Sequence, residues 1–519
     1  MAGRAAEKEE LAGSHRSEPR GAVVAGEIDP DEPLTVTLYF KRRSPKPAPG
    51  SKADLARLMR PMTRRALDAE RLRTHRQAAS RIIEFAEENG VVVCDVDHTR
   101  RRMRLEAPAG RLAELFGVSL GLYHDGKRTF RARSGPLRVP RAIAPWTRAV
   151  LGFDQRPQVQ SLAAGTGDEG LWPTEIARLY GIPLDQDVTS QCVGIIALGG
   201  GYRPTDLSTA LARMGRAPPI VVDHPVGGVT NQWSDGSKSD EEIALDLQVL
   251  AGLMPGARIV VYFAANTSAA LAEAIHEAVL DETNRPQVLS ISWGSPEKYW
   301  TSQTRAAVQA ALADAVTRKV TVVAASGDEL ATSGVSDGKA HVWFPASSPY
   351  VLGCGGTAIT LGAVGIVSES VWNDGSVGTG GGISDVYPVP DYQSALPIPT
   401  SVSTGAPGRG VPDIAALASA SPGYRIVLDG KEMVKDGTSA ATPLWAALIA
   451  MANARRGAPV GLVHPQLYAA PGLLRPIITG DNRAHGVGYA ATAGWNACAG
   501  LGVPRGAAII DALAAVPVA

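Results

Sequence analysis

Alternating strand-like and helix-like segments in the C-terminal two thirds of the chain constrain its fold most strongly. Four short apolar runs indicate buried strands, at 193–198, 258–263, 288–292 and 320–325. Helical patterns accompany them near 240–253, 267–281 and 302–318. Buried strands that alternate with helices are typical of a parallel sheet covered by helices on its faces. We therefore predict an α/β domain over residues 172–519.

The N-terminal part has a different pattern. LTVTLYF at 34–40 indicates a strand, and a long helix is predicted over 64–90, ending at Gly90. Further short strands and a short helix follow, so we predict a small α+β domain over 34–158.

Two segments flank this predicted domain. Residues 1–33 are charged and poor in large apolar side chains, which predicts a disordered tail. Residues 159–171 lie between the two domains and are interpreted as a linker.

The charge distribution follows the same division. Residues 1–165 hold 30 Lys and Arg and 20 Asp and Glu, a net charge of +10; residues 166–519 hold 21 and 31, a net charge of −10. Opposite charges favour docking of the two parts onto each other. Nucleic-acid binding is the alternative for a basic segment, but its arginines are interspersed with acids and no zinc-ligand spacing or nucleic-acid motif accompanies them. We expect no nucleic-acid partner.

The segment DGTSAATP at 436–443 runs into the apolar stretch LWAALIAMA. This order predicts that Ser439 lies at the N-terminus of a buried helix, where unpaired N–H groups and the helix dipole favour negative charge. A nucleophile whose reaction creates an oxyanion suits such a position. Pro443 is expected in the first turn, where it removes no helical hydrogen bond. A capping serine without a catalytic role is the alternative.

A histidine base for Ser439 is not evident. Subtilisin-like peptidases carry a His-Gly-Thr signature, which this chain lacks. The histidines of the C-terminal part are scattered, at His224, His276, His341, His464 and His485. A neutral subtilisin-like peptidase is therefore disfavoured.

Two carboxyl groups offer a different partner. Glu242 and Asp246 are four residues apart in the predicted helix near 240–253, so they share one face. Repulsion between them holds a proton on one of them to higher pH, and such a pair can act as a general base in acid. A solvated acidic helix face is the alternative.

One more carboxyl group follows the predicted strand at 320–325. Asp328 lies in the loop at the carboxyl end of this strand, the edge at which parallel sheets build active sites. A simple turn aspartate is the alternative.

Together these motifs resemble the sedolisin family of serine-carboxyl peptidases, and in particular its kumamolisin-like members. The E-x-x-x-D element matches at Glu242 and Asp246, the G-T-S-x-x-x-P element at 437–443, and the strand-end G-D at 327–328. Supporting stretches occur in family order: IIALGGGY at 195–202, LSISWGSPE at 289–297, FPASSPYVLGCGGT at 344–357, TGGGISDVYPVPDYQ at 379–393 and GRGVPDIAA at 408–416. The N-terminal part resembles the activation prodomain of the family, with LYFKRR at 38–43 and VLGFDQRPQ at 150–158.

The resemblance implies a fold and a set of roles. The fold would be a subtilisin-like parallel sheet flanked by helices, preceded by a prodomain that inhibits the enzyme intramolecularly. Ser439 would be the nucleophile, Glu242 the general base, Asp246 the residue that orients and tunes Glu242, and Asp328 the oxyanion partner. Because an ionised Asp328 would repel the oxyanion, the family chemistry requires acid. The expected function is an acid-active, self-processing serine-type endopeptidase that acts on polypeptides.

Three departures from the family pattern affect the expected site. The loop after Asp328 reads GDELATSG in place of the usual Gly-Asp-x-Gly, and Ala197 stands where kumamolisin-like enzymes carry a glutamate. The family's calcium loop aligns with RPIITGDN at 475–482 and GWNAC at 494–498, so that its two aspartates become Ile477 and Asn496. Carbonyl groups at Ile478 and Gly494 alone would bind calcium poorly. We expect a degenerate calcium site and no other cofactor.

These departures leave an alternative open, a catalytically impaired pseudo-peptidase that acts as a binding protein. The four intact residues of the resemblance weigh against it. The four cysteines, Cys94, Cys192, Cys354 and Cys498, are too few and scattered for a disulfide framework. No apolar run is long enough to span a membrane, and no hydrophobic signal-peptide core is present. An extracellular location is expected from the resemblance alone.

Overall fold

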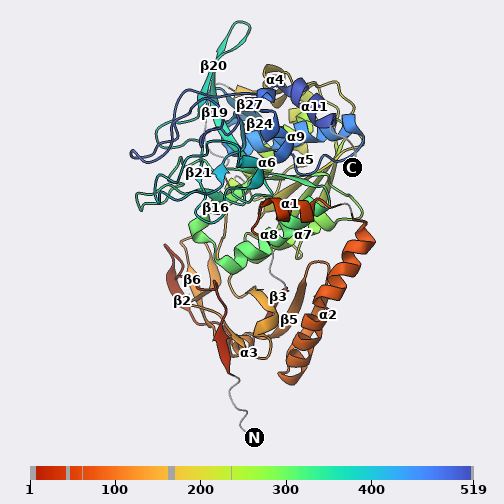
Figure 1. Cartoon of the computed structure of the whole chain (residues 1–519), viewed down its shortest axis with the longest axis vertical. Helices are drawn as coiled ribbons and strands as arrows, with labels where there is room; N and C mark the ends of the chain where they lie inside the picture. The colour runs from red at the N-terminus through yellow and green to blue at the C-terminus, as the bar shows by residue number, and fades with distance from the viewer. Residues whose placement is uncertain (1–6, 43–46, 61, 162–169, 235–236, 516–519) are drawn as a thin grey trace.

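The computed structural model describes residues 7–42, 47–60, 62–161, 170–234 and 237–515. The chain forms two lobes (Figure 1). The N-terminal lobe, red to yellow in Figure 1, lies below a larger lobe that contains the C-terminal two thirds of the chain.

The large lobe is built on an eight-stranded sheet. Six neighbouring strands run parallel in the order β13-β14-β12-β15-β17-β19. Strand β19 also pairs with β23 in parallel and with β20 in antiparallel orientation. The strands are β12 (Cys192–Leu198), β13 (Ile220–Pro225), β14 (Arg258–Ala264), β15 (Val288–Ile291), β17 (Thr321–Ala325), β19 (Leu352–Gly362), β20 (Gly365–Val371) and β23 (Ile414–Leu417). The four predicted strands are thus confirmed, because continuous apolar runs suit strands that are buried on both faces.

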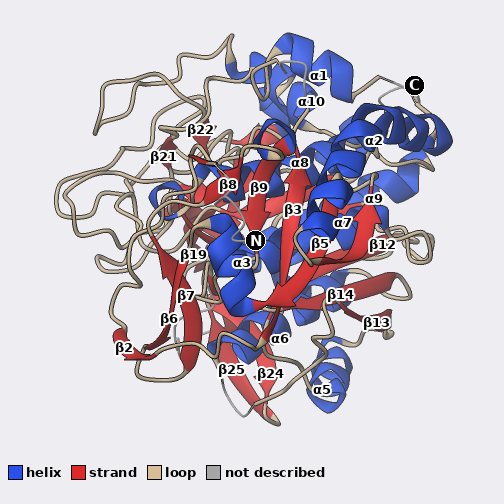
Figure 2. Ribbon diagram, turned by 90° about the horizontal axis from the view of Figure 1, so that it is seen from below, coloured by secondary structure: helices blue, strands red, loops and turns tan. Residues whose placement is uncertain are grey.

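Helices cover this sheet as the α/β pattern predicts. Helix α6 packs against α9, and α7 packs against α8, which lies next to the N-terminal lobe (Figures 1 and 2). The helices are α4 (Pro173–Leu179), α5 (Pro204–Met214), α6 (Lys238–Leu253), α7 (Ser268–Leu280), α8 (Ser302–Thr317), α9 (Thr438–Arg456), α10 (His464–Ala469) and α11 (Gly506–Ala514). Burial of α9 is nearly continuous from Thr438 to Asn453, so it is the central helix of the lobe.

Short strands form smaller sheets around the main one. They pair as β10-β16-β18, β11-β24-β25, β21-β22 and β26-β27. Their bounds are β10 (Gln160–Ser161), β11 (Gly170–Leu171), β16 (Trp293–Pro296), β18 (Trp343–Phe344), β21 (Gly382–Ile383), β22 (Gly410–Val411), β24 (Gly423–Leu428), β25 (Lys431–Lys435), β26 (Leu474–Arg475) and β27 (Val503–Pro504).

The N-terminal lobe contains a βαββαβ unit with an antiparallel sheet in the order β4-β5-β3-β9. Its elements are β3 (Pro33–Phe40), α2 (Arg64–Glu88), β4 (Val92–Asp97), β5 (Arg102–Pro108), α3 (Ala109–Phe116) and β9 (Thr147–Leu151). Helix α1 (Lys52–Leu58) precedes α2, and the strands β6 (Ser119–His124), β7 (Thr129–Ser134) and β8 (Arg138–Pro140) lie between α3 and β9. This lobe has its own hydrophobic core, as the predicted small α+β domain requires.

The predicted disordered tail at 1–33 is wrong for its described residues. Strand β1 (Lys8–Glu10) pairs with β8, and β2 (Val23–Gly26) pairs with β6. Leu11 and Ile28 pack against the core of the lobe. Main-chain pairing and a few apolar anchors therefore order a segment whose composition alone indicates disorder. Residues 1–6 lie outside the described residues.

The predicted linker at 159–171 joins the lobes. Its ends form β10 and β11, whereas residues 162–169 lie outside the described part. The four cysteines are all free. None of the described helices combines the length and hydropathy needed to cross a bilayer.

Candidate active site

Ser439 occupies the predicted position at the start of α9. Gly437 caps the helix with φ of 113°, a backbone angle that favours glycine, which explains the Gly in the G-T-S motif. Ser439 is fully buried, and its Oγ has no hydrogen-bond partner in the described part of the chain. A buried hydroxyl without a partner is uncommon and fits a group reserved for a reaction.

The expected place of Pro443 in the first turn is wrong. It is the sixth residue of α9 and lies inside the helix. Because proline has no N–H, the carbonyl of Ser439 loses its helical hydrogen bond. The Oγ of Ser292 lies 3.4 Å from this carbonyl and 2.7 Å from Asp246 Oδ1. Ser292 therefore connects the start of α9 with the predicted carboxylate pair.

Glu242 and Asp246 both lie on α6 and are fully buried, which rules out the solvated acidic face. Ser237 caps this helix and accepts a hydrogen bond from the backbone N–H of Asp240, which fixes the start of α6. Burial raises the pKa of Asp246 well above its usual value, and the charge of Glu242 raises it further. Helix α6 packs on α9, and Ser292 joins Asp246 to the Ser439 carbonyl.

Asp328 follows β17 and is bound to the same helix start. Its Oδ1 accepts hydrogen bonds from the backbone N–H of Thr438 at 2.8 Å and from Thr438 Oγ1 at 2.7 Å. Its Oδ2 has no hydrogen-bond partner within the described ranges. Burial raises the pKa of Asp328 well above its usual value. The negative charges of Asp436 and Glu242 raise this pKa further, whereas the hydrogen bonds from Thr438 lower it. Oδ2 is thus the oxygen on which a proton would be carried.

Two residues of this site escape prediction from the sequence. Ser292 falls within the quoted LSISWGSPE stretch, but nothing in the sequence gives it a role, and it meets Ser439 only through folding. Asp436 begins the quoted DGTSAATP segment, but nothing in the sequence gives it a role. Burial raises the pKa of Asp436 to about 7, and the charge of Asp374 adds to this increase. The cluster therefore binds protons more tightly than isolated carboxyl groups do.

The altered loop after Asp328 is held by the glycine-rich segment at 378–382. The N–H of Gly378 donates to Asp328 O at 2.9 Å, and the N–H of Gly380 donates to Gly327 O at 2.7 Å. A Cβ on Gly380 would lie 2.3 Å from Ser326 O, so only glycine permits this approach. Ala197, the second departure, lies buried in β12 and supplies no carboxyl group.

The histidines lie elsewhere. His224, His276, His341 and His464 face Asp281, Asp314, Asp337 and Asp413, respectively, and His485 is exposed. Since Ser439 Oγ has no hydrogen-bond partner among the described residues, none of these rings serves it as a base.

The linker strand β10 pairs with a strand that directly follows Ser292. It pairs antiparallel with β16, with Gln160 opposite Gly294 and Ser161 opposite Trp293. The next residue of the large lobe is Ser292, which contacts the Ser439 carbonyl. The direction from Gln160 to Ser161 in β10 is therefore the direction from Gly294 towards Ser292 on the opposite strand.

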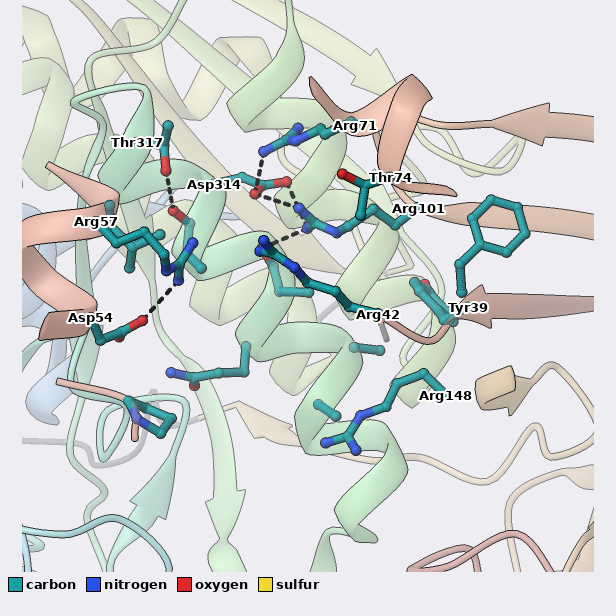
Figure 3. Close-up of a pocket in the computed structure, with 18 of the residues that line it drawn as sticks. Tyr39, Arg42, Asp54, Arg57, Arg71, Thr74, Arg101, Arg148, Asp314 and Thr317 are labelled. Atoms are coloured by element: carbon teal, nitrogen blue, oxygen red, sulfur yellow. Dashed lines mark hydrogen bonds and ion pairs between the residues drawn. The ribbon is translucent and has the colours of Figure 1, made fainter. Parts of the chain in front are cut away.

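The two lobes meet through ion pairs centred on Asp314 of α8. Arg71 donates to Asp314 Oδ1 at 2.6 Å, and Arg101 donates to both carboxylate oxygens at 2.9 and 2.8 Å (Figure 3). Burial opposes ionisation of Asp314, but these two arginines and His276 hold its pKa well below its usual value. A cavity of about 500 Å³ lies beside this cluster at the interface.

Neighbouring arginines of the N-terminal lobe contact acids on α7. Arg102 donates to Glu273 at 2.6 Å, and Arg100 lies 2.9 Å from Glu277. The opposite net charges of the two parts thus meet as specific ion pairs where the lobes contact each other.

The residues aligned with the family's calcium loop do not fit a calcium ion. Ile477 is a buried apolar side chain, while Ile478 is exposed. The Nδ2 of Asn496 donates to the carbonyls of Ile477 at 3.0 Å and Thr492 at 3.1 Å, while its Oδ1 accepts from two backbone N–H groups. An N–H donor thus occupies the place where a cation would need oxygen ligands. Gly494 has φ of 80° and supplies only backbone.

The nearest carboxylate is also engaged. Asp481 Oδ1 accepts the N–H of Arg483 at 2.9 Å, and its Oδ2 lies 3.5 Å from the Arg483 guanidinium. Within the described ranges, no three His, Cys, Asp or Glu side chains gather in a way that could hold a metal ion.

Comparison with known proteins gives matches over both lobes. The family model for the "Pro-kumamolisin, activation domain" matches residues 20–156, and that for the "Subtilase family" matches 227–460. Kumamolisin of Bacillus sp. (strain MN-32) is 38% identical over 531 residues, which cover 98% of this chain and 96% of the relative.

More distant relatives also match most of this chain. Sedolisin of Pseudomonas sp. (strain 101) is 29% identical and covers 81% of this chain and 76% of its own. Human tripeptidyl-peptidase 1 is also 29% identical, with 73% and 72% covered. The solved structure of Pseudomonas sedolisin, a serine-carboxyl proteinase complexed with pseudo-iodotyrostatin, superposes with a TM-score of 0.60 over 67% of this chain and 98% of its own.

Proposed function

Because the chain belongs to the sedolisin family of serine-carboxyl peptidases, is similar to kumamolisin and carries an activation prodomain, we propose that it is an acid endopeptidase that releases its own prodomain. The observation that supports this most is the linker strand β10, which runs antiparallel along β16 and ends opposite Trp293, the neighbour of Ser292, whose side chain contacts the Ser439 carbonyl. Hydrolysis of peptide bonds follows from the family; the endopeptidase mode and the residue roles are part of the proposal.

The proposed reaction proceeds through an acyl-enzyme. Ser439 Oγ attacks the substrate carbonyl carbon while Glu242 takes the hydroxyl proton. The proton on Asp328 Oδ2 is donated as a hydrogen bond to the oxyanion. Collapse breaks the C–N bond, and Glu242 returns its proton to the leaving amine. Water then repeats these steps to release the acid and restore Ser439.

The supporting residues tune this chemistry. Asp246 holds Ser292 and lies one helical turn from Glu242, so it is a positioning residue for the base. Asp328 Oδ1 is engaged by Thr438, which leaves Oδ2 for the proton. A role that requires a protonated Asp328 accounts for activity in acid.

The prodomain would inhibit by covering the cleft. Its arginines bind acids of α7 and α8, and the linker strand β10 that follows it would occupy the position of a substrate. Release of the prodomain would cut an internal peptide bond of the chain, which is an endopeptidase step. Processing is proposed between Ser161 and Gly170. An extracellular location remains a proposal from the family resemblance.

The base assignment is tested by a pH–rate profile of the matured enzyme and its Glu242→Gln variant. We expect wild-type hydrolysis of a peptide to peak in acid and fall towards neutrality, and the variant to lose at least about 100-fold in kcat. Glu241→Gln is the matched control, because Glu241 lies next to Glu242 on the same helix but pairs with Lys435. A neutral optimum, or a Glu242→Gln variant with wild-type kcat, would contradict the proposal.

A further inference from the structure

The side chain of Asn266 makes three hydrogen bonds to the backbone at the junction of the N-terminal domain and the linker. Its Oδ1 accepts from the N–H groups of Gln158 at 3.2 Å and Val159 at 3.1 Å. Its Nδ2 donates to the carbonyl of Val159 at 2.8 Å. Asn266 lies in the short loop between β14 and α7 of the catalytic domain. It belongs to the enzyme and not to the segment that maturation removes.

A second contact fixes the same stretch of linker. Ser295 Oγ, from β16, donates to the carbonyl of Gln158 at 2.9 Å. The contacts of Asn266 and Ser295 with Gln158 and Val159 engage backbone atoms, which any peptide can offer. The Val159 side chain is only 3% exposed and belongs to the main hydrophobic core, so the cleft there accepts an apolar group.

The register of β10 relates these contacts to the reacting bond. Ser161 lies opposite Trp293 and Gln160 opposite Gly294. Continuing this antiparallel register by one residue brings a substrate residue opposite Ser292, which contacts Ser439. If that residue is P1, the first on the acyl side of the scissile bond, then P2 and P3 lie opposite Trp293 and Gly294. Val159 and Gln158 then stand at P4 and P5.

We infer that Asn266 is a positioning residue of the matured enzyme, which binds the main chain of a polypeptide substrate at P4 and P5. It accepts the P4 and P5 N–H groups and donates to the P4 carbonyl, and the adjoining subsite takes an apolar P4 side chain. The inference rests on the proposed peptidase function and deepens it. The substrate class is an extended internal stretch of polypeptide and not a free N-terminal tripeptide.

The first test compares peptides that differ only in length. Peptides with free N-termini and one common sequence from P3 to the leaving side end at P3, P4 or P5, and kcat/KM is measured with matured wild type and Asn266→Ala. We expect extension to P5 to raise wild-type kcat/KM about tenfold, the effect of a few net hydrogen bonds, and the variant to lose most of this gain. The two enzymes should hydrolyse the P3 peptide within about twofold of each other. Asn284→Ala is the matched control, because Asn284 lies near Arg258 at the amino end of β14, whereas Asn266 follows the carboxyl end of this strand.

A second measurement needs no variant. An ester in place of the P4 amide removes one N–H donor and should lower wild-type kcat/KM about fivefold on the P5 peptide. The same ester should have little effect on Asn266→Ala. An equal gain on extension in both enzymes, or no effect of the ester on wild type, would overturn the inference and leave the peptidase function intact. Failure to cleave a peptide of any length, P3 included, would contradict the proposed function and the inference together.

Discussion

At the scale of single residues, the site is a cluster of buried carboxyl groups around one serine. Burial disfavours the ionised form, so Asp246, Asp328 and Asp436 all have raised pKa values. Thr438 organises Asp328 by binding only one of its oxygens. The proposed acid chemistry would thus arise from the low polarity of the site and from the direction of two hydrogen bonds.

The role of Asp328 can be separated from its charge. Asp328→Ala removes the oxyanion donor and should lower kcat by about 10²–10³. Asp328→Asn keeps a neutral donor, so it should retain more activity and respond less to pH between 4 and 7. The measurement is kcat against pH for the two matured variants. Equal activity of Asp328→Ala and wild type would remove Asp328 from the mechanism.

Asp436 should make the protein more stable in acid than at neutrality. Its pKa is about 7 in the folded chain and about 4 when unfolded, so its contribution is complete below pH 4 and is lost as pH rises through 7. The shift corresponds to roughly 4 kcal/mol. Denaturant unfolding of the Ser439→Ala precursor should give a lower free energy of unfolding at pH 7 than at pH 4. The Ser439→Ala/Asp436→Asn double variant should show a smaller decrease in the free energy of unfolding between pH 4 and 7. An equal decrease in both proteins would mean that Asp436 does not cause the pH dependence.

At the scale of elements, strands and buried helices could be predicted and the connections that complete the site could not. β12, β14, β15 and β17 follow from apolar runs that need no tertiary information. Ser292 and Ser439 are 147 residues apart, and Ser292 contacts a carbonyl that Pro443 leaves without its helical N–H partner. The N-terminal strands β1 and β2 depend on pairing with β8 and β6, which local composition does not encode.

The loop with Ile477 and Asn496 leads to a prediction against the family pattern. Because the Asn496 amide already binds the Ile477 carbonyl, calcium should stabilise the protein little. The Tm of the Ser439→Ala precursor should differ by less than about 2 °C between excess chelator and millimolar calcium. A rise of several degrees with calcium would show that oxygen ligands in this loop still bind the ion.

At the scale of the whole molecule, the prodomain and the catalytic domain form a charged interface around Asp314. The depressed pKa of Asp314 means that its pairs persist at mildly acid pH, because a carboxyl group of lowered pKa loses its stabilising effect only below its usual range. Release of the prodomain in acid must therefore begin at other contacts or follow cleavage of the linker.

Weakening this interface should expose α8. Arg101→Ala in the Ser439→Ala precursor removes two hydrogen bonds to Asp314. Hydrogen exchange of α8 should become faster by about tenfold or more, since breaking a buried ion pair costs several kcal/mol. Arg148→Ala is the control, because Arg148 is exposed at the same cavity. Equal exchange in the two variants would contradict a role of Arg101 in docking.

The central claim, that Ser439 cuts its own precursor with the help of buried carboxyl groups, is tested most directly by intact mass after acidification. Purified wild-type chain should shorten to about two thirds of its length at acid pH and stay intact at neutral pH, with the new N-terminus between 162 and 170. Ser439→Ala should remain at full length under both conditions, since loss of the nucleophile removes several orders of magnitude in rate. Shortening of purified Ser439→Ala at the wild-type rate would contradict the account.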